Sequence, residues 1–142
     1  MGRLLGVDPG QRRVGVAVSD EAGVIATPLT TIDRESEDAS RRLETIIEKR
    51  DVSKIIVGFP EPLNTSENER TRQVDQFIED VIEPLAVDFE SVSERYSTKQ
   101  ATQRKRDREN GGEAGDDEAA AMILEWYLNS NKHTDSNTSE YS

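Results

Sequence analysis

The order of secondary-structure signals constrains this chain more than any other feature of its sequence. Three β-rich runs come first, separated by turns short enough for antiparallel pairing, over residues 3–8, 14–19 and 24–32. Helical and strand patterns then alternate, with helices predicted over about 37–50, 66–83, 97–109 and 116–129 and strands over 54–60 and 87–92. This order predicts an α/β fold in which a mixed β-sheet of about five strands, the first three antiparallel, is flanked by helices.

The composition fits one domain followed by a polar tail. A chain of 142 residues is long enough for a single core, so we predict one domain over residues 1–129. Residues 130–142 are rich in Ser, Asn and Thr and are predicted to be disordered. No stretch reaches the roughly 20 apolar residues that a membrane span requires, so we expect a soluble, cytoplasmic protein without a membrane partner.

Several kinds of chemistry are excluded by residues that the chain lacks. It contains no cysteine, which rules out disulfides, zinc–thiolate sites and cysteine nucleophiles. Its one histidine, His133, lies in the polar tail, which argues against a histidine triad. The formal net charge is −11, and abundant acids with few lysines are typical of a protein that works in high salt. The same charge opposes binding of a polyanion unless a local surface is basic.

Asp8 ends the first apolar run and is followed directly by Pro9 and Gly10. Functional groups of α/β sheets gather at the carboxyl ends of strands, so this acid is a candidate for metal or phosphate chemistry. The alternative is an ordinary Asp-Pro-Gly turn, in which the carboxylate hydrogen-bonds its own backbone. The position of Asp8 alone does not decide between these two interpretations.

Further acids occupy comparable positions at the ends of predicted elements. Glu94 follows the last predicted strand, and Asp116 or Asp117 begins the last helix. Carboxylates without His or Cys suit Mg²⁺ or Mn²⁺, and two such ions can activate water and stabilise the leaving oxygen of a phosphodiester. The alternatives are a surface ion pair between Glu94 and Arg95 and a capping role for the acid at the helix start.

A basic segment follows Glu94 directly. Residues 95–108 carry six cations against one acid, and two arginines in the first turn add to this positive charge. Such a segment is suitably placed to hold phosphates beside the acids, whereas the alternative is an ordinary solvated helix face. The candidate nucleic-acid contacts are Arg12, Arg13, Arg95, Thr98, Lys99, Arg104 and Lys105.

Four segments form an ordered set of motifs: 8–20, 55–60, 94–101 and 116–127. Together they resemble the opening signature, central strand, glutamate motif and final helix of the YqgF family, also called RuvX or Holliday junction resolvase. Members of that family are regarded as nucleases that mature the 5′ end of the 16S ribosomal RNA precursor. The resemblance covers about residues 2–129 and implies a ribonuclease H-like fold. It also implies that Asp8, Glu94 and Asp116 are the metal-binding carboxylates.

Matching the sequence to this family requires one choice, the register of the last helix, and shows three positions that differ from the family's motifs. Counting back from Leu124 in the last helix selects Asp116 over Asp117. The departures are Asn64-Thr65 for the usual Asp-Gly turn, Ser93 for the acid before the glutamate, and residues 111–115 for a basic stretch. The last change removes positive charge beside the site, so it affects how tightly and in what way a substrate binds. The three implied ligands stay in place.

We therefore predict a hydrolase that acts on phosphodiester bonds, with Mg²⁺ or Mn²⁺ in a two-metal site. The predicted nuclease cleaves structured RNA and matures the 5′ end of precursor 16S ribosomal RNA. Alternatives are a resolvase of branched DNA and a non-catalytic RNA or ribosome-assembly module of the same fold. A sugar-kinase or actin-like protein also begins with Asp-x-Gly but needs two such domains, and this chain supplies one. The sequence leaves open whether cleavage is endo- or exonucleolytic, where the substrate is cleaved, and whether the protein is a monomer or a homodimer.

Overall fold

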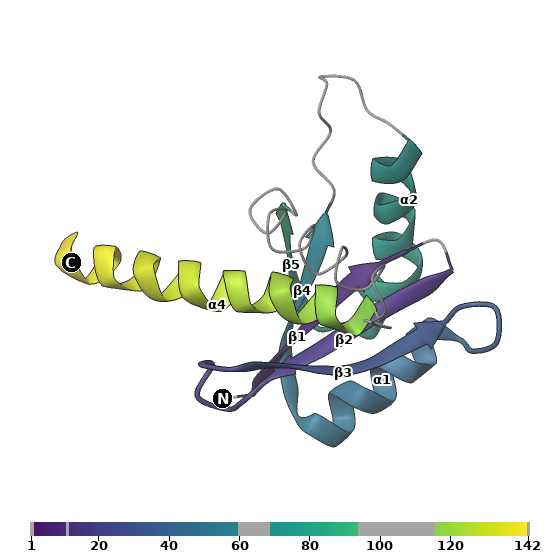
Figure 1. Ribbon diagram of the computed structural model, residues 1–142, viewed down its shortest axis with the longest axis horizontal. Coiled ribbons are helices and arrows are strands. Elements are labelled where there is room, and N and C mark those ends of the chain that lie inside the picture. The colour runs from purple at the N-terminus through teal and green to yellow at the C-terminus, as the bar shows by residue number, and fades with distance from the viewer. Residues whose placement is uncertain (1, 11, 60–68, 94–115, 142) are drawn as a thin grey trace, which may run out of the picture.

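The computed structural model describes residues 2–10, 12–59, 69–93 and 116–141, with residue 70 and residues 131–141 described as backbone only. Its strands form one five-stranded sheet in the order β3-β2-β1-β4-β5 (Figure 1). The strands are β1 (Arg3–Pro9), β2 (Arg13–Ser19), β3 (Ala26–Asp33), β4 (Val52–Phe59) and β5 (Asp88–Ser93). The first three pair antiparallel, whereas β4 pairs parallel with β1 and β5 parallel with β4. The predicted α/β class and mixed sheet with an antiparallel start are therefore confirmed.

The described helices cover both faces of this sheet. They are α1 (Ala39–Arg50), α2 (Glu69–Phe77), which continues through a π-helical turn (Ile78–Ile82) and a 3₁₀ turn (Glu83–Leu85), and α4 (Asp116–Tyr141). Figure 1 shows α4 running across the strands, and the buried clusters place α1 and α2 on the opposite face. The helix predicted over 97–109 and the predicted helix start at residue 66 lie outside the described residues.

Side chains of the central strands alternate between two buried clusters. On β1, Leu5 and Val7 pack with α1 and α2, whereas Leu4 packs against the cluster beneath α4. On β4, Ile55 belongs to the first cluster and Ile56 to the second. Because both faces of the sheet are covered, these strands appear in the sequence as nearly continuous apolar runs. The arrangement leaves the carboxyl ends of β1, β4 and β5 at one edge of the sheet.

Local sequence sets the two ends of α1. The carboxylate of Asp38 accepts a hydrogen bond of 3.2 Å from the backbone N–H of Arg41, which caps the first turn. The helix ends at Asp51, which adopts the left-handed conformation at φ 54° and donates its N–H to the carbonyl of Ile47. Leu43 is fully buried against the sheet, so the predicted one-sided amphipathic helix is confirmed.

Helix α4 extends further than its apolar pattern predicts. Leu128 is the last buried residue among those of α4 whose side chains are described, residues 116–130, yet the backbone continues as a helix to Tyr141, and its far end projects beyond the sheet in Figure 1. The helix end predicted at Asn129 differs from this, because residues 130–141 contain no Gly or Pro to end the helix. The division into a domain over 1–129 and a separate disordered tail over 130–142 stays a prediction. Among the described residues, no helix has the length and apolar character of a membrane span.

Candidate active site

Asp8 lies near the carboxyl end of β1, on the face that α4 covers. It pairs with Gly15 of β2 in the antiparallel register, so the two residues are direct neighbours across the sheet. Two positions before Asp8, a Cβ added to Gly6 would lie 2.9 Å from the carbonyl oxygen of Ala120 in α4. Since residues i and i+2 of a strand point to the same face, the side chain of Asp8 also points toward the α4 side.

The start of α4 rests directly on Gly15. A Cβ at Gly15 would lie 1.9 Å from the carbonyl oxygen of Asp116 and 2.3 Å from its carbonyl carbon, closer than any side chain could approach. Only glycine therefore allows the helix to begin at this point. Because Gly15 is the cross-strand partner of Asp8, this contact brings the backbone of Asp116 to the same edge of the sheet as Asp8.

The acids at this edge, Asp8 on β1 and three residues at the start of α4, are all half-buried. Asp8 as a whole is half-buried, and its Oδ1 oxygen is shielded from solvent. Removing a carboxylate oxygen from water disfavours the charged form unless a cation or hydrogen-bond donors compensate it. Asp116, Asp117 and Glu118 form an acidic first turn of α4, where the helix dipole favours negative charge.

The helical register distinguishes Asp116 from Asp117. Residues four apart lie on one face of a helix, so Asp116 shares a face with Ala120 and Leu124. Both of these apolar residues are fully buried and contact the sheet at Gly6. Asp117 lies about 100° further round the helix. The face that packs on the sheet is thus continuous with Asp116, as the register counted back from Leu124 implies.

Several predicted site residues fall outside the described part of the chain. They are Glu94, Arg95, Thr98, Lys99, Arg104 and Lys105. The last described residue of β5 is Ser93, and β5 is a parallel neighbour of β4. Among the described residues, no group of three or more His, Cys, Asp or Glu side chains is arranged to hold a metal ion. Because Glu94 is not described, Asp8 and Asp116 are the two members of the predicted triad whose position at this edge can be stated.

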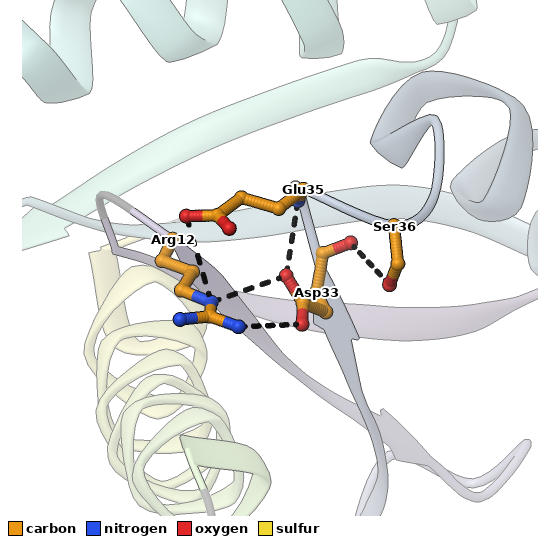
Figure 2. Close-up of polar contacts among 4 residues, drawn as sticks. All are labelled: Arg12, Asp33, Glu35 and Ser36. Carbon is orange, nitrogen blue, oxygen red and sulfur yellow. Dashed lines mark hydrogen bonds and ion pairs between the residues drawn. The ribbon is translucent and has the colours of Figure 1, made fainter.

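Arg12, a predicted phosphate contact, forms ion pairs with acids at the end of β3 (Figure 2). Its guanidinium lies 3.4 Å from Asp33 Oδ2 and 3.7 Å from Glu35 Oε2, and its side chain is 57% exposed. The backbone N–H of Glu35 donates to Asp33, and with Arg12 this hydrogen bond lowers the pKa of the Asp33 carboxyl. Arg13, at the start of β2, is exposed. Both arginines thus lie next to the turn that follows Asp8, with Arg12 already ion-paired.

A cluster of three hydrogen-bonded side chains anchors α4 to β4 and β5. Lys54 of β4 donates hydrogen bonds to Tyr127 Oη at 3.2 Å and to Glu90 Oε1 at 3.0 Å, and Tyr127 donates to Glu90 at 3.4 Å. The hydrogen bond to Tyr127 and then that to Glu90 raise the pKa of Lys54. This group links β4, β5 and α4, so it helps to fix the helix whose first residue lies over Gly15.

The sequence analysis missed the role of Gly15. It lies between Val14 and Val16 in a strand, and an isolated glycine in a strand pattern is a known sign of close backbone approach. That sign could have indicated that another backbone crosses the sheet here. It could not have identified the crossing segment, because the start of α4 is about a hundred residues further along the sequence.

The sheet order and strand directions define the class of the protein. Three antiparallel strands, then two strands added in parallel, with one acid at the end of β1 and another at the start of the last helix, make a ribonuclease H-like α/β domain. Within that class the chain belongs to the RuvX family. The family model, described as "RuvX: Holliday junction resolvase", matches residues 2–130. The resemblance seen in the four motifs is therefore confirmed.

Two relatives with similar sequences share the name "Putative pre-16S rRNA nuclease". A protein of Sulfurihydrogenibium sp. (strain YO3AOP1) is 36% identical over 132 residues, which covers 90% of each chain. A protein of Thermoanaerobacter pseudethanolicus (strain ATCC 33223 / 39E) is 36% identical over 137 residues, covering 92% of this chain and 99% of the relative. Among solved structures, T. thermophilus RuvC in complex with a Holliday junction substrate aligns with TM-score 0.46 and 17% identity, covering 66% of this chain and 65% of that one.

Proposed function

We propose that this protein is a divalent-metal-dependent nuclease that hydrolyses phosphodiester bonds of structured RNA and matures the 5′ end of precursor 16S ribosomal RNA. The observation that carries the proposal is the contact of Asp116 with Gly15, the cross-strand partner of Asp8. It supports a site in which two acids from distant segments act together. The names of the relatives support the choice of RNA as the substrate.

Asp8, Glu94 and Asp116 are the proposed metal ligands. All three supply carboxylate oxygens, and the shielded Oδ1 of Asp8 is a donor that a hard divalent cation would suit. Glu94 follows Ser93, the last residue of β5, directly in the sequence. When bound, Mg²⁺ or Mn²⁺ would lower the pKa of a water molecule and stabilise negative charge on the phosphodiester. No side-chain nucleophile is then required.

The residues of the chain would orient the substrate around these acids. Asp8 is held by a central strand with neighbours on both sides, so its position is rigid. Arg12 and Arg13, next to the turn after β1, would bind phosphates, with Arg12 leaving Asp33 and Glu35 to do so. The further proposed contacts with the substrate backbone are Arg95, Thr98, Lys99, Arg104 and Lys105.

A cleavage assay with a charge-matched pair of variants tests the proposal. Asp8→Asn keeps the shape of the side chain and removes its charge, so we expect it to abolish cleavage of a precursor 16S fragment in Mg²⁺ or Mn²⁺. Asp88→Asn makes the same change at an exposed residue where β5 begins, at the opposite end of the parallel strands, and should cleave normally. Full activity of Asp8→Asn, with an unchanged folded fraction, would remove Asp8 from the mechanism.

The family description supports a second candidate substrate, a four-way DNA junction. The same assay should therefore include such a junction beside the RNA, at several salt concentrations. Preference for the junction would change the substrate and leave the proposed ligands intact. Absence of Mn²⁺ binding in a calorimetric titration would instead favour a non-catalytic RNA or ribosome-assembly module. With precursor RNA as the substrate, we expect the protein to act in the cytoplasm, as a monomer or a homodimer.

A further inference from the structure

A cavity lies at the same edge of the sheet, on the face that α2 covers. Its volume is about 470 Å³, within the range of pockets that hold small ligands. Pro9 and Gly10 form one wall, and Arg34, Glu69, Gln73 and Phe77 are among the side chains that form the others. None of these residues belongs to the site proposed around Asp8. The walls come from three separate parts of the chain: the turn after β1, the residue after β3, and helix α2.

The chemistry of this cavity is suited to a flat ligand with hydrogen-bonding edges. The guanidinium of Arg34 lies 5.2 Å from the centroid of the Phe77 ring and donates a hydrogen bond of 3.4 Å to the carbonyl of Gly10. Among the described residues Arg34 forms no ion pair with an acid. Phe77 is only 2% exposed, so the planar surface open to a ligand is that of the exposed guanidinium.

The position of the cavity connects it with Asp8. Pro9 and Gly10 follow Asp8 directly, so the cavity wall begins within about 7 Å of Asp8 along the backbone. Asp8 faces α4, whereas Phe77 belongs to the cluster on the other face. A nucleic-acid strand bound at Asp8 that crosses the edge of the sheet at this turn would reach the cavity after roughly two nucleotides, given about 3.4 Å per nucleotide in a stacked strand.

We propose that the cavity binds an unpaired nucleobase of the substrate strand, close to the phosphodiester that is cleaved. This inference rests on the proposed nuclease function, because it assumes that a nucleic-acid strand lies at Asp8. Unpaired bases in protein complexes stack on aromatic rings or on arginine guanidinium planes, and amide side chains bind their edges. Glu69 repels a phosphate but accepts hydrogen bonds from the amino group of a base. The occupant is therefore the base and not the phosphate.

Binding of a short single-stranded RNA, followed by fluorescence anisotropy in EDTA at low salt, tests the proposal. EDTA prevents metal-dependent cleavage, so the result does not depend on the nuclease assay. Arg34→Gln should weaken binding about tenfold, and Arg34→Lys should weaken it similarly because it keeps the charge but loses the planar surface. Arg41→Gln is the matched control: it removes the same charge from an exposed residue of α1 and should change the affinity less than about twofold.

Abasic substitution along the oligonucleotide identifies the bound base. At one position, loss of the base should weaken binding to the wild-type chain about tenfold and cause no further loss with Arg34→Gln. Equal weakening by Arg34→Gln and Arg41→Gln, or wild-type affinity of Arg34→Lys, would show simple charge attraction and overturn the proposal. The same conclusion would follow if every abasic loss were equal in both proteins. If the protein binds RNA tightly through Arg34 but cleaves no substrate, the base-binding role of the cavity would be supported and the proposed nuclease function would be rejected.

Discussion

Replacing Gly15 with alanine tests the contact on which the site depends. The new Cβ would lie 1.9 Å from the carbonyl oxygen of Asp116, whereas unstrained carbon–oxygen contacts are about 3.3 Å or longer. The start of α4 must therefore move by about 1 Å or more, away from Asp8. Overpacking of this kind costs about 1–3 kcal/mol of unfolding free energy. A misplacement of about 1 Å among reacting groups reduces the rate by about a hundredfold.

Two measurements separate the effect on the site from the effect on stability. Urea denaturation gives the unfolding free energy of Gly15→Ala, and single-turnover cleavage at saturating Mn²⁺ gives the rate of the folded protein. Gly6→Ala is the graded control, since its Cβ would lie 2.9 Å from the carbonyl of Ala120, further along the same helix. It needs a shift of only a few tenths of an ångström, so we expect a smaller loss in both measurements. Wild-type cleavage by folded Gly15→Ala would refute the reasoning.

Three further predictions concern stability. Tyr127→Phe removes the hydroxyl that accepts from Lys54, so it should lower the unfolding free energy by about 1 kcal/mol in urea denaturation. The pKa of Asp33 is lower in the folded chain, so its contribution is present above its ordinary value of 3.8 and is lost as pH falls further. Unfolding of Asp33→Asn should accordingly depend less on pH below about 4 than that of the wild-type chain. Truncation after Asn129 should leave the melting temperature within about 2 °C if residues 130–142 are the separate polar tail that their Ser, Asn and Thr content predicts; a larger fall would contradict a separate tail.

The fold could be predicted from the sequence because the patterns that indicate its strands, turns and helices are local. The short turns after β1 and β2 limit their pairing to antiparallel neighbours, and the crossover helix between β3 and β4 allows a parallel strand to be added beside β1. Asp8 could be selected for the same reason, since an acid at the end of an apolar run is visible in a few residues. The choice of Asp116 needed the resemblance to a family, because 29 acids make position alone a weak signal.

The contacts around the carboxyl end of β1 could not be predicted from the sequence, because they join residues that are far apart in it. Gly15 is visible as a glycine in a strand, but its partner Asp116 is defined only once α4 crosses the sheet. Arg34 follows a strand and Phe77 ends a helix, and nothing in either local pattern indicates that the guanidinium covers the ring. Arg12 was predicted from its charge alone, and its ion pair with Asp33 depends on the register between β2 and β3.

The charge of the chain limits how it can hold a nucleic acid. At −11 overall, with Arg12 paired to Asp33 and Glu35, the described edge offers little net positive charge to a phosphate backbone. Attraction to phosphates also falls steeply as salt rises, whereas stacking of a base on a guanidinium plane depends on contact area. At high salt, a substrate would therefore be held less by surface arginines than by metal ions bound to the proposed acidic ligands and by a base in the proposed Arg34 cavity. On this reasoning a net charge of −11 is compatible with a nuclease, because bound metal ions and the guanidinium of Arg34 would supply the positive charge that the edge otherwise lacks.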